Sequence, residues 1–300
     1  MSRSKNPQHD MERLLKSMSG KNFQSKEELE KYMDQFVGRP IDEIIANQNQ
    51  SELTDEEKSE ELVYRAYEAP GIEEADELIT LALKLNPKNS MAYLFLAERE
   101  EDAIVALGFY GCVLDLDTKK LGKKFIKVNT GHFWLIHETR TLMRAKAGLA
   151  ECFVLLGEKD KAIAHYQDML GLNHNDNQGV RYLLLTLLLE ENKSKEIDYL
   201  FSKYPDDASA SFAFSKALMA FKKEGATEEA YHCLQKASEV NEFIINYLLG
   251  FKKMSKKLPE YIGFGDENEA IMYMNDAGYL WKDRKIQSWL LECKEKLKKR

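Results

Sequence analysis

One segment of the chain constrains its fold more than any other: residues 142–176, which read LMRAKAGLAECFVLLGEKDKAIAHYQDMLGLNHND. Small and large apolar residues occur at helical spacing on both sides of Gly157, at Leu149, Ala150, Phe153, Ala162, Tyr166 and Met169. Alanine lets two helices cross closely, and the larger side chains fill the space beside the crossing. Neither helix can bury its apolar face alone, so pairs of this kind must stack on neighbouring pairs.

Weaker copies of the same helix pair precede and follow this segment. Residues 73–89 have the pattern of the second helix of a pair, with Ala75, Ile79, Ala82 and Pro87 at the corresponding positions. Ala97 follows in the first helix of the next pair. Residues 212–241 repeat the order with Phe221, Gly225, Ala230, Leu234 and Ala237. Residues 178–204 form a shortened pair whose first helix is apolar on nearly every side, so other helices must cover it. The repeat predicts an all-α chain.

Composition divides the chain into an N-terminal arm with a short helix and a linker, residues 1–52, and a helical repeat domain, residues 53–297. Residues 1–24 are polar and low in aliphatic side chains, so we expect them to be mobile. The domain boundary is placed where the polar linker gives way to periodic apolar residues.

Two N-terminal capping signals mark the first helices. Ser25 with Glu28 three residues later predicts a short helix that ends at Gly38. Thr54 with Glu57 has the same spacing and predicts the first helix of the repeat domain.

The repeated segments resemble the tetratricopeptide-repeat superfamily, whose helix pairs stack into a right-handed α-solenoid. Three stretches are similar to a narrower group, bacterial tetratricopeptide proteins related to the suppression-of-tumorigenicity family: GHFWLIHETRTLMRAKAGLAECFVLLGEKDKAIAHYQDML, NDNQGVRYLLL and YLLGFKKMSKKLPEYIGFGDENEAIMY. The resemblance covers roughly residues 55–290, although His174 stands where the superfamily usually has proline. It implies a non-enzymatic interaction protein and brings no catalytic residue and no cofactor.

Composition narrows the partners. Hydrophobic residues make up 44% and charged residues 31% of the chain, and the formal net charge is −7, so a generally basic surface for nucleic acid is not expected. The longest nearly apolar run, residues 182–189, is far shorter than the roughly 20 residues of a membrane-spanning helix. No apolar signal region starts the chain, so we expect a cytoplasmic protein without a membrane partner.

The spacing of the cysteines also favours a reducing compartment such as the cytoplasm. The chain has four cysteines, with no CxxC pair among them, at Cys112, Cys152, Cys233 and Cys293. We expect them to be free and buried as small hydrophobic residues.

The stretch GHFWLIHETR, residues 131–140, concentrates chemically active side chains. His137 and Glu138 begin like the zinc-protease HExxH motif, but the second histidine is missing. His132 and His137 differ by about 140° around a helix, which is poor geometry for a shared metal ion. We therefore predict no metal site.

Helical spacing suggests a different role for the same stretch. Leu135, Leu142, Leu149, Phe153 and Leu156 are predicted to form the buried face of a helix. A polar stripe follows on another side, at Trp134, His137, Arg140, Arg144 and Glu151, and Arg181 and Tyr182 would extend it. Arginine forks on such a stripe could hold the carboxylates of an acidic peptide. The alternative is that these side chains only solvate the helix or bond to the preceding loop.

Three other motifs have simpler interpretations. The first is a helix cap rather than a nucleotide site, at Asn175 and Gln178. The second is a helix cap rather than a phosphate site, at Asp266 and Glu269, and it follows a turn that contains Gly263 and Gly265. Asp115 and Asp117 resemble a DxD site, but about 200° separates them on a helix, so we treat the motif as chance.

Three functions remain open. The first is a peptide- or protein-binding adaptor that uses Trp134, His137, Arg140, Arg144, Arg181 and Tyr182. The second is a nucleic-acid- or nucleotide-binding repeat that uses Arg140, Arg144, Arg181, Tyr182 and Asn177. The third is a metal-dependent hydrolase with His137 and Glu138 as an acid–base pair. The adaptor is the preferred hypothesis, and its mechanism is preorganisation, since stacked helices present side chains without an ordering cost at binding.

Overall fold

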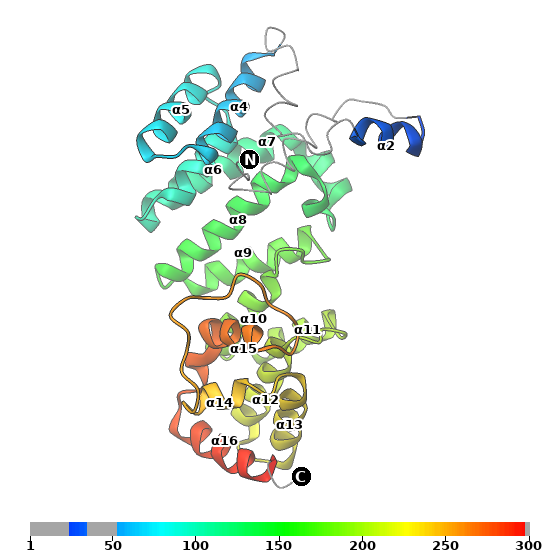
Figure 1. The fold of residues 1–300 in the computed structure, drawn as a ribbon, viewed down its shortest axis with the longest axis vertical. Helices are drawn as coiled ribbons and strands as arrows, with labels where there is room; N and C mark the ends of the chain where they lie inside the picture. Colours follow the sequence, from blue (N-terminus) through cyan, green and yellow to red (C-terminus); the bar gives the residue numbers. More distant parts are fainter. Residues whose placement is uncertain (1–23, 35–52, 298–300) are drawn as a thin grey trace. The chain divides into compact units, whose positions relative to one another are not determined.

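The computed structural model describes residues 24–34 and 53–297, and every regular element in those ranges is helical (Figure 1). The chain forms two compact units, Met1–Asn175 and Asp176–Arg300. The first contains α2 (Lys26–Asp34), α4 (Asp55–Glu68), α5 (Ile72–Leu85), α6 (Ser90–Arg99), α7 (Ala103–Asn129), the 3₁₀ turn η2 (Phe133–Leu135), α8 (His137–Leu155) and α9 (Lys159–Leu172). The second contains α10 (Val180–Glu190), α11 (Ser194–Lys203), α12 (Ala210–Glu224), α13 (Glu228–Val240), α14 (Ile244–Leu248), α15 (Glu267–Ala277), η3 (Gly278–Trp281) and α16 (Arg284–Leu297). The all-α prediction is confirmed for this part of the chain.

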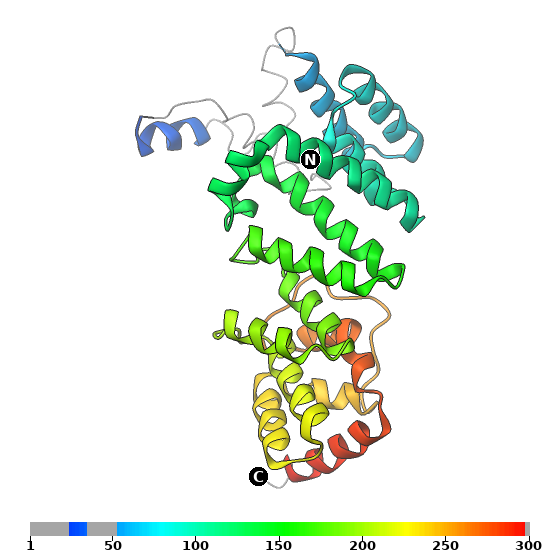
Figure 2. The ribbon, with the colours of Figure 1, turned by 180° about the vertical axis from the view of Figure 1, so that it is seen from behind.

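In the first unit, consecutive helices pack in pairs. Helix α4 lies against α5, α6 against α7, and α8 against α9, while α6 also contacts α4 and α8 (Figure 2). Helix α7 packs against α8 as closely as the members of a pair pack against each other. The alanines predicted to mark close crossings are buried, namely Ala75, Ala82, Ala97, Ala150 and Ala162. Among the described residues, buried clusters form around Val63 and Phe95 and around Val113 and Leu149.

The second unit continues the paired pattern and then departs from it. Helix α10 packs on α11 and α12, and α12 packs on α13. Most of α10 is buried, as its apolar sequence predicts, although Leu183 is 38% exposed. Helices α14, α15 and α16 cover this core from the C-terminal side, where Phe221 stacks on Trp289 with ring centroids 4.6 Å apart.

Helix starts follow the predicted caps closely. Thr54 Oγ1 accepts a hydrogen bond from the Glu57 backbone, and the Glu57 carboxylate accepts one from the Thr54 backbone, so that capping box is complete. Ser25 Oγ accepts from the Glu28 backbone at 3.2 Å. The helix that it starts is described to Asp34, and the predicted end at Gly38 lies outside the described residues.

One cap differs from its prediction. At the start of α10, the Asp176 carboxylate accepts from the backbone N–H groups of Val180 at 2.8 Å and Arg181 at 3.0 Å. The expected pair, Asn175 and Gln178, does not perform this role. Because Asp176 has φ of 47° and Gly179 has φ of 71°, the turn is tighter than a standard capping box, and the cap moves to Asp176.

The predicted buried face of the helix in residues 135–156 is correct only in its middle. Leu142 and Leu149 are buried, but Leu135 is 60% exposed and Leu156 is 41% exposed. Leu135 lies in η2, before α8 begins at His137, and Leu156 is the C-cap residue of α8. Helical periodicity therefore does not apply at either end.

The cysteine prediction is partly wrong. All four cysteines are free, and Cys152 and Cys293 are buried as expected. Cys112 is exposed, and Cys233 is only half-buried. Within the described ranges, no helix is both long enough and apolar enough to cross a lipid bilayer.

A glycine in α8 is required by a close approach. A Cβ added to Gly148 would lie 2.1 Å from Cζ of Tyr110, a ring that is itself buried on α7. Because the ring would have to move, we expect Gly148→Ala to lower the free energy of unfolding by about 2 kcal/mol, despite the higher helix propensity of alanine. Urea unfolding followed by circular dichroism measures this change.

Gly111→Ala in α7 is the matched control. A Cβ at Gly111 meets nothing within 4 Å, so this substitution should raise stability by up to about 1 kcal/mol. Equal stability of the two variants would contradict the proposed close contact between α7 and α8.

Candidate functional site

The stretch that begins at Gly131 forms a short loop, tied to the end of α9, that leads into α8. The Gly131 backbone N–H donates to Leu172 O at 2.8 Å, and the His174 N–H donates back to Gly131 O at 2.9 Å. Gly131 has φ of 101°, and an added Cβ would lie 2.9 Å from the His174 ring. This contact gives His174 a local packing role.

Trp134 is held by this loop rather than by a helix. It lies in η2, and its backbone carbonyl accepts a hydrogen bond from Arg140 Nε at 3.1 Å. The Arg140 guanidinium carbon lies 5.7 Å from the centre of the Trp134 ring. The predicted helical stripe therefore starts at His137, and Trp134 joins Arg140 through the loop.

A cavity of about 620 Å³ lies in the first unit where the end of α7 passes the starts of α6 and α8. We call it the α7–α8 cavity. Its wall includes two of the predicted site residues, His137 and Arg140, together with Glu60, Ser90, Met91, Asp117, Lys120, Leu121, Phe125, Leu135, Glu138 and Thr141. Helix α7 bends at Gly122, where φ is 75° and ψ is 154°, so Phe125 follows the bend on the same wall.

Arg140 is the arginine of the cavity wall. Its side chain is half-buried, and within the described residues it forms no salt bridge, because its hydrogen bond to Trp134 uses only Nε. The two terminal nitrogens of the guanidinium thus remain available to a ligand. A guanidinium in this state can form a bidentate pair with a carboxylate.

Asp117 is the functional candidate that sequence reasoning missed. It is only 4% exposed, and its Oδ2 atom is buried without a hydrogen-bond partner. Burial raises the pKa of Asp117 to about 6, although a hydrogen bond from Ser90 and the charge of Lys120 lower it in part. Asp115, by contrast, is exposed and bonds to Lys119 at 2.6 Å. The two aspartates lie on different sides of α7, as the helical angle predicts, but only one of them is an ordinary surface residue.

Arg144 lies one turn beyond Arg140 and is already paired. Its Nη2 donates to both Glu98 carboxylate oxygens at 2.8 Å and to the Tyr67 hydroxyl at 3.2 Å. The Arg144 side chain is 19% exposed and the Glu98 side chain 29% exposed, and burial raises the pKa of Tyr67. An external carboxylate would have to compete with Glu98 for this arginine.

Arg181 and Tyr182 form a closed network in the second unit. Arg181 Nε donates to Asp207 at 2.6 Å and Nη1 donates to Asp176 at 3.0 Å, while Nη2 donates to the Tyr182 hydroxyl at 2.6 Å. The Asp176 and Asp207 side chains are 1% and 3% exposed. Arg144 and Arg181 are thus neutralised by carboxylates of the protein itself. These are two of the arginines that an acidic peptide or a phosphate backbone would need.

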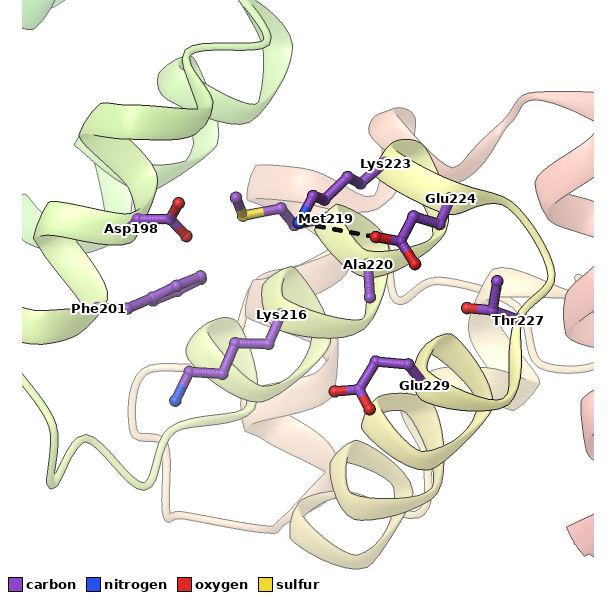
Figure 3. Close-up of a pocket in the computed structure, with 9 residues that line it drawn as sticks. All are labelled: Asp198, Phe201, Lys216, Met219, Ala220, Lys223, Glu224, Thr227 and Glu229. Atoms are coloured by element: carbon purple, nitrogen blue, oxygen red, sulfur yellow. Dashed lines mark ion pairs between the residues drawn. The ribbon is translucent and has the colours of Figure 1, made fainter.

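A second, smaller cavity of about 240 Å³ lies in the second unit, where α11 meets α12 and the start of α13 (Figure 3). Lys216 lies 5.2 Å from the centre of the Phe201 ring, and Lys223 pairs with Glu224 at 3.7 Å. The Lys223 and Glu224 side chains are 73% and 58% exposed, so water screens their charges. We find no buried, unpaired polar group among the residues of this wall that would mark a ligand site.

Metal chemistry has no donor set in the described ranges. No group of three or more histidine, cysteine, aspartate or glutamate side chains there is arranged to hold an ion. His137 and Glu138 both line the α7–α8 cavity, but Arg140 lies one turn from His137 on the same wall. A guanidinium at that position would repel a cation bound between His137 and Glu138.

Comparisons with known proteins do not identify the chain. No family model matches its sequence. No curated protein matches it either. The assignment of a candidate site therefore depends on the geometry of the α7–α8 cavity.

Proposed function

We propose that this chain is a non-enzymatic, cytoplasmic scaffold, a right-handed α-solenoid of tetratricopeptide-like helix pairs that binds a peptide or protein partner. The paired packing of α4 to α9 and the buried alanines at the crossings support the architecture. The four free cysteines are compatible with a reducing compartment. The partner would lie along the first helices of the pairs, with the α7–α8 cavity as its anchoring pocket.

The availability of Arg140 is the observation that supports this proposal best. Its two terminal guanidinium nitrogens form no salt bridge with a carboxylate of the described chain, whereas Arg144 and Arg181 are paired in this way. Trp134 fixes the guanidinium through both its carbonyl and its ring, so little side-chain entropy is lost when a ligand binds. A glutamate, an aspartate or a C-terminal carboxylate of the partner would complete the pair.

A test of this proposal starts from peptides selected by phage display against the full chain. Peptides that bind the α7–α8 cavity should contain an acidic group, and Arg140→Glu should weaken their binding by at least about tenfold, because it replaces an attractive charge by a repulsive one. Fluorescence anisotropy with labelled peptides measures the dissociation constants. Thermal unfolding confirms that the variant is folded.

Arg65→Glu is the matched control, since Arg65 is an exposed arginine on α4 that does not line the cavity. It makes the same change of net charge, so it should leave the affinity within about twofold at physiological salt, where charges beyond a Debye length are screened. Equal losses in the two variants would show a nonspecific charge effect. Failure of the library to yield any binding peptide would also count against the proposed function.

A further inference from the structure

Asp117 is a buried acidic residue that forms no salt bridge within the described part of the chain. It lies on α7 in the wall of the α7–α8 cavity, with 4% of its surface exposed. Ser90, at the start of α6, donates a hydrogen bond to the carboxylate, but Oδ2 has no partner. An unpaired oxygen of this kind is costly, so the protein alone leaves the site incomplete.

The cations of the cavity wall compensate the Asp117 charge only in part, through Lys120. Lys120 lies one helical turn from Asp117, but its ammonium group bonds to Glu56 at 2.7 Å, and its side chain is 64% exposed. Arg140 donates from Nε to the Trp134 carbonyl and forms no salt bridge with Asp117. The cavity therefore has two separate polar positions of opposite sign, at Asp117 and at Arg140.

The surroundings of Asp117 favour a cationic ligand group. Glu138 lines the same cavity, so a second carboxylate there also attracts positive charge. Rotation about the bond to a carboxyl group is soft, so either oxygen of Asp117 can turn toward the cavity. The aliphatic stem of a long basic side chain could pack on Met91 and Leu121, which are also in the wall.

We infer that the Asp117 side of the α7–α8 cavity binds the ammonium or guanidinium group of a lysine or arginine side chain. This inference rests on the proposed function, because the basic side chain belongs to the peptide whose carboxylate pairs with Arg140. The cavity then selects a segment that carries both an acidic and a basic group. Selection by two opposite charges is more specific than selection by Arg140 alone, since a uniformly acidic or uniformly basic segment satisfies only one position.

The first experiment needs no peptide. The full chain is labelled with ¹³C-aspartate, and the Asp117 carboxyl signal is assigned from its loss in Asp117→Asn. Titration with n-butylammonium, with sodium chloride replaced to keep the ionic strength constant, should lower the pKa of Asp117 from about 6 toward its ordinary value. The neutral analogue n-butanol should not do so. An unchanged Asp117 pKa at saturating n-butylammonium, or an equal effect of n-butanol, overturns the inference.

The second experiment is a double-mutant cycle with a peptide from the phage selection. Replacing its lysine by norleucine should weaken binding to the wild-type chain by about tenfold, the usual effect of losing a charged hydrogen bond, and by less than about twofold in Asp117→Asn. Asp115→Asn on the exposed side of α7 is the matched control and should behave as wild type. Equal losses in wild type and Asp117→Asn overturn the inference.

The two proposals fail in different ways. If Arg140→Glu loses binding but Asp117 shows no coupling to the peptide lysine, the peptide site is supported and only the cation subsite is contradicted. If n-butylammonium lowers the pKa of Asp117 but the library yields no binding peptide, the cation subsite is supported and the peptide-binding function is contradicted.

Discussion

Arg181→Met should lower the free energy of unfolding by about 3–5 kcal/mol, the usual cost of removing one partner from a buried ion pair. Arg181 bonds to Asp176 and Asp207 at the start of α10, and both carboxylates are almost completely buried. Burial alone would raise the pKa of Asp207, but hydrogen bonds from Ser209 and Arg181 lower it below its ordinary value. Methionine fills a similar volume, so the loss measures the charge and its hydrogen bonds rather than a void.

Urea unfolding followed by circular dichroism gives the size of the Arg181→Met effect, and hydrogen exchange in residues 180–203 shows where it acts. Lys257→Met is the control, because Lys257 pairs with Glu260 on an exposed loop and should change stability by less than about 0.5 kcal/mol. Addition of Asp207→Asn to Arg181→Met should recover part of the loss, because one uncompensated charge is then removed. If the double variant instead loses the sum of the free energies lost by Arg181→Met and by Asp207→Asn alone, the network does not act as a unit.

Asp117→Asn should remove a pH dependence that is built into the wild-type chain. The folded-state pKa of Asp117 is about 6 and its ordinary value is 3.8, so the native state binds more protons than the unfolded state between these values. Stability is therefore lost as the pH rises through this window. At about 1.4 kcal/mol for each pKa unit, and because part of the loss has already occurred at pH 4, wild type should lose about 2.5 kcal/mol between pH 4 and pH 7.5 through this group.

The measurement is the difference in unfolding free energy between wild type and Asp117→Asn at each pH. The asparagine amide has its own cost of burial, but that cost is independent of pH, so only the pH-dependent part is assigned to the carboxylate. Asp115→Asn is the control, since Asp115 is exposed and paired with Lys119. A constant difference between wild type and Asp117→Asn from pH 4 to pH 7.5 would show that Asp117 is not desolvated as the structure indicates.

A stabilising Asp117→Asn variant would also have a functional meaning. The carboxylate that destabilises the chain above pH 6 is the same group that would pair with a cation in the α7–α8 cavity. A ligand that binds only the folded state shifts the folding equilibrium toward that state. The folding free energy lost at Asp117 and the binding free energy gained there by a cationic ligand would thus have the same cause, the lack of a cation beside the carboxylate.

Local sequence predicted the helical fold class, one complete helix cap and the buried alanines. The capping box of Thr54 and Glu57 starts α4, and alanines such as Ala82 and Ala150 lie at buried crossings. These features depend on contacts within a few residues of the chain or on a periodicity of 3.6, which a sequence shows directly. The same reasoning failed at Leu135 and at Asn175, where a 3₁₀ turn and two residues with positive φ interrupt the helical register.

The candidate site depended on contacts that local sequence does not contain. Arg140 and Arg144 are one turn apart on α8 and look equivalent in the sequence, yet Arg144 pairs with Glu98, which is 46 residues away, and Arg140 pairs with no carboxylate of the described chain. Arg181 is likewise occupied by Asp207. Which cation remains available is decided when separate helices pack together, because the Coulomb energy depends on distance in space rather than along the chain.

Asp117 shows the same division most clearly. The sequence by itself determined that Asp115 and Asp117 lie on a helix and point in different directions. Only the tertiary structure decided that one of them faces water and the other is enclosed beside the starts of α6 and α8. The physical reason is that helix geometry fixes the angle between two side chains, whereas the surroundings of each side chain depend on which neighbouring helices cover its face.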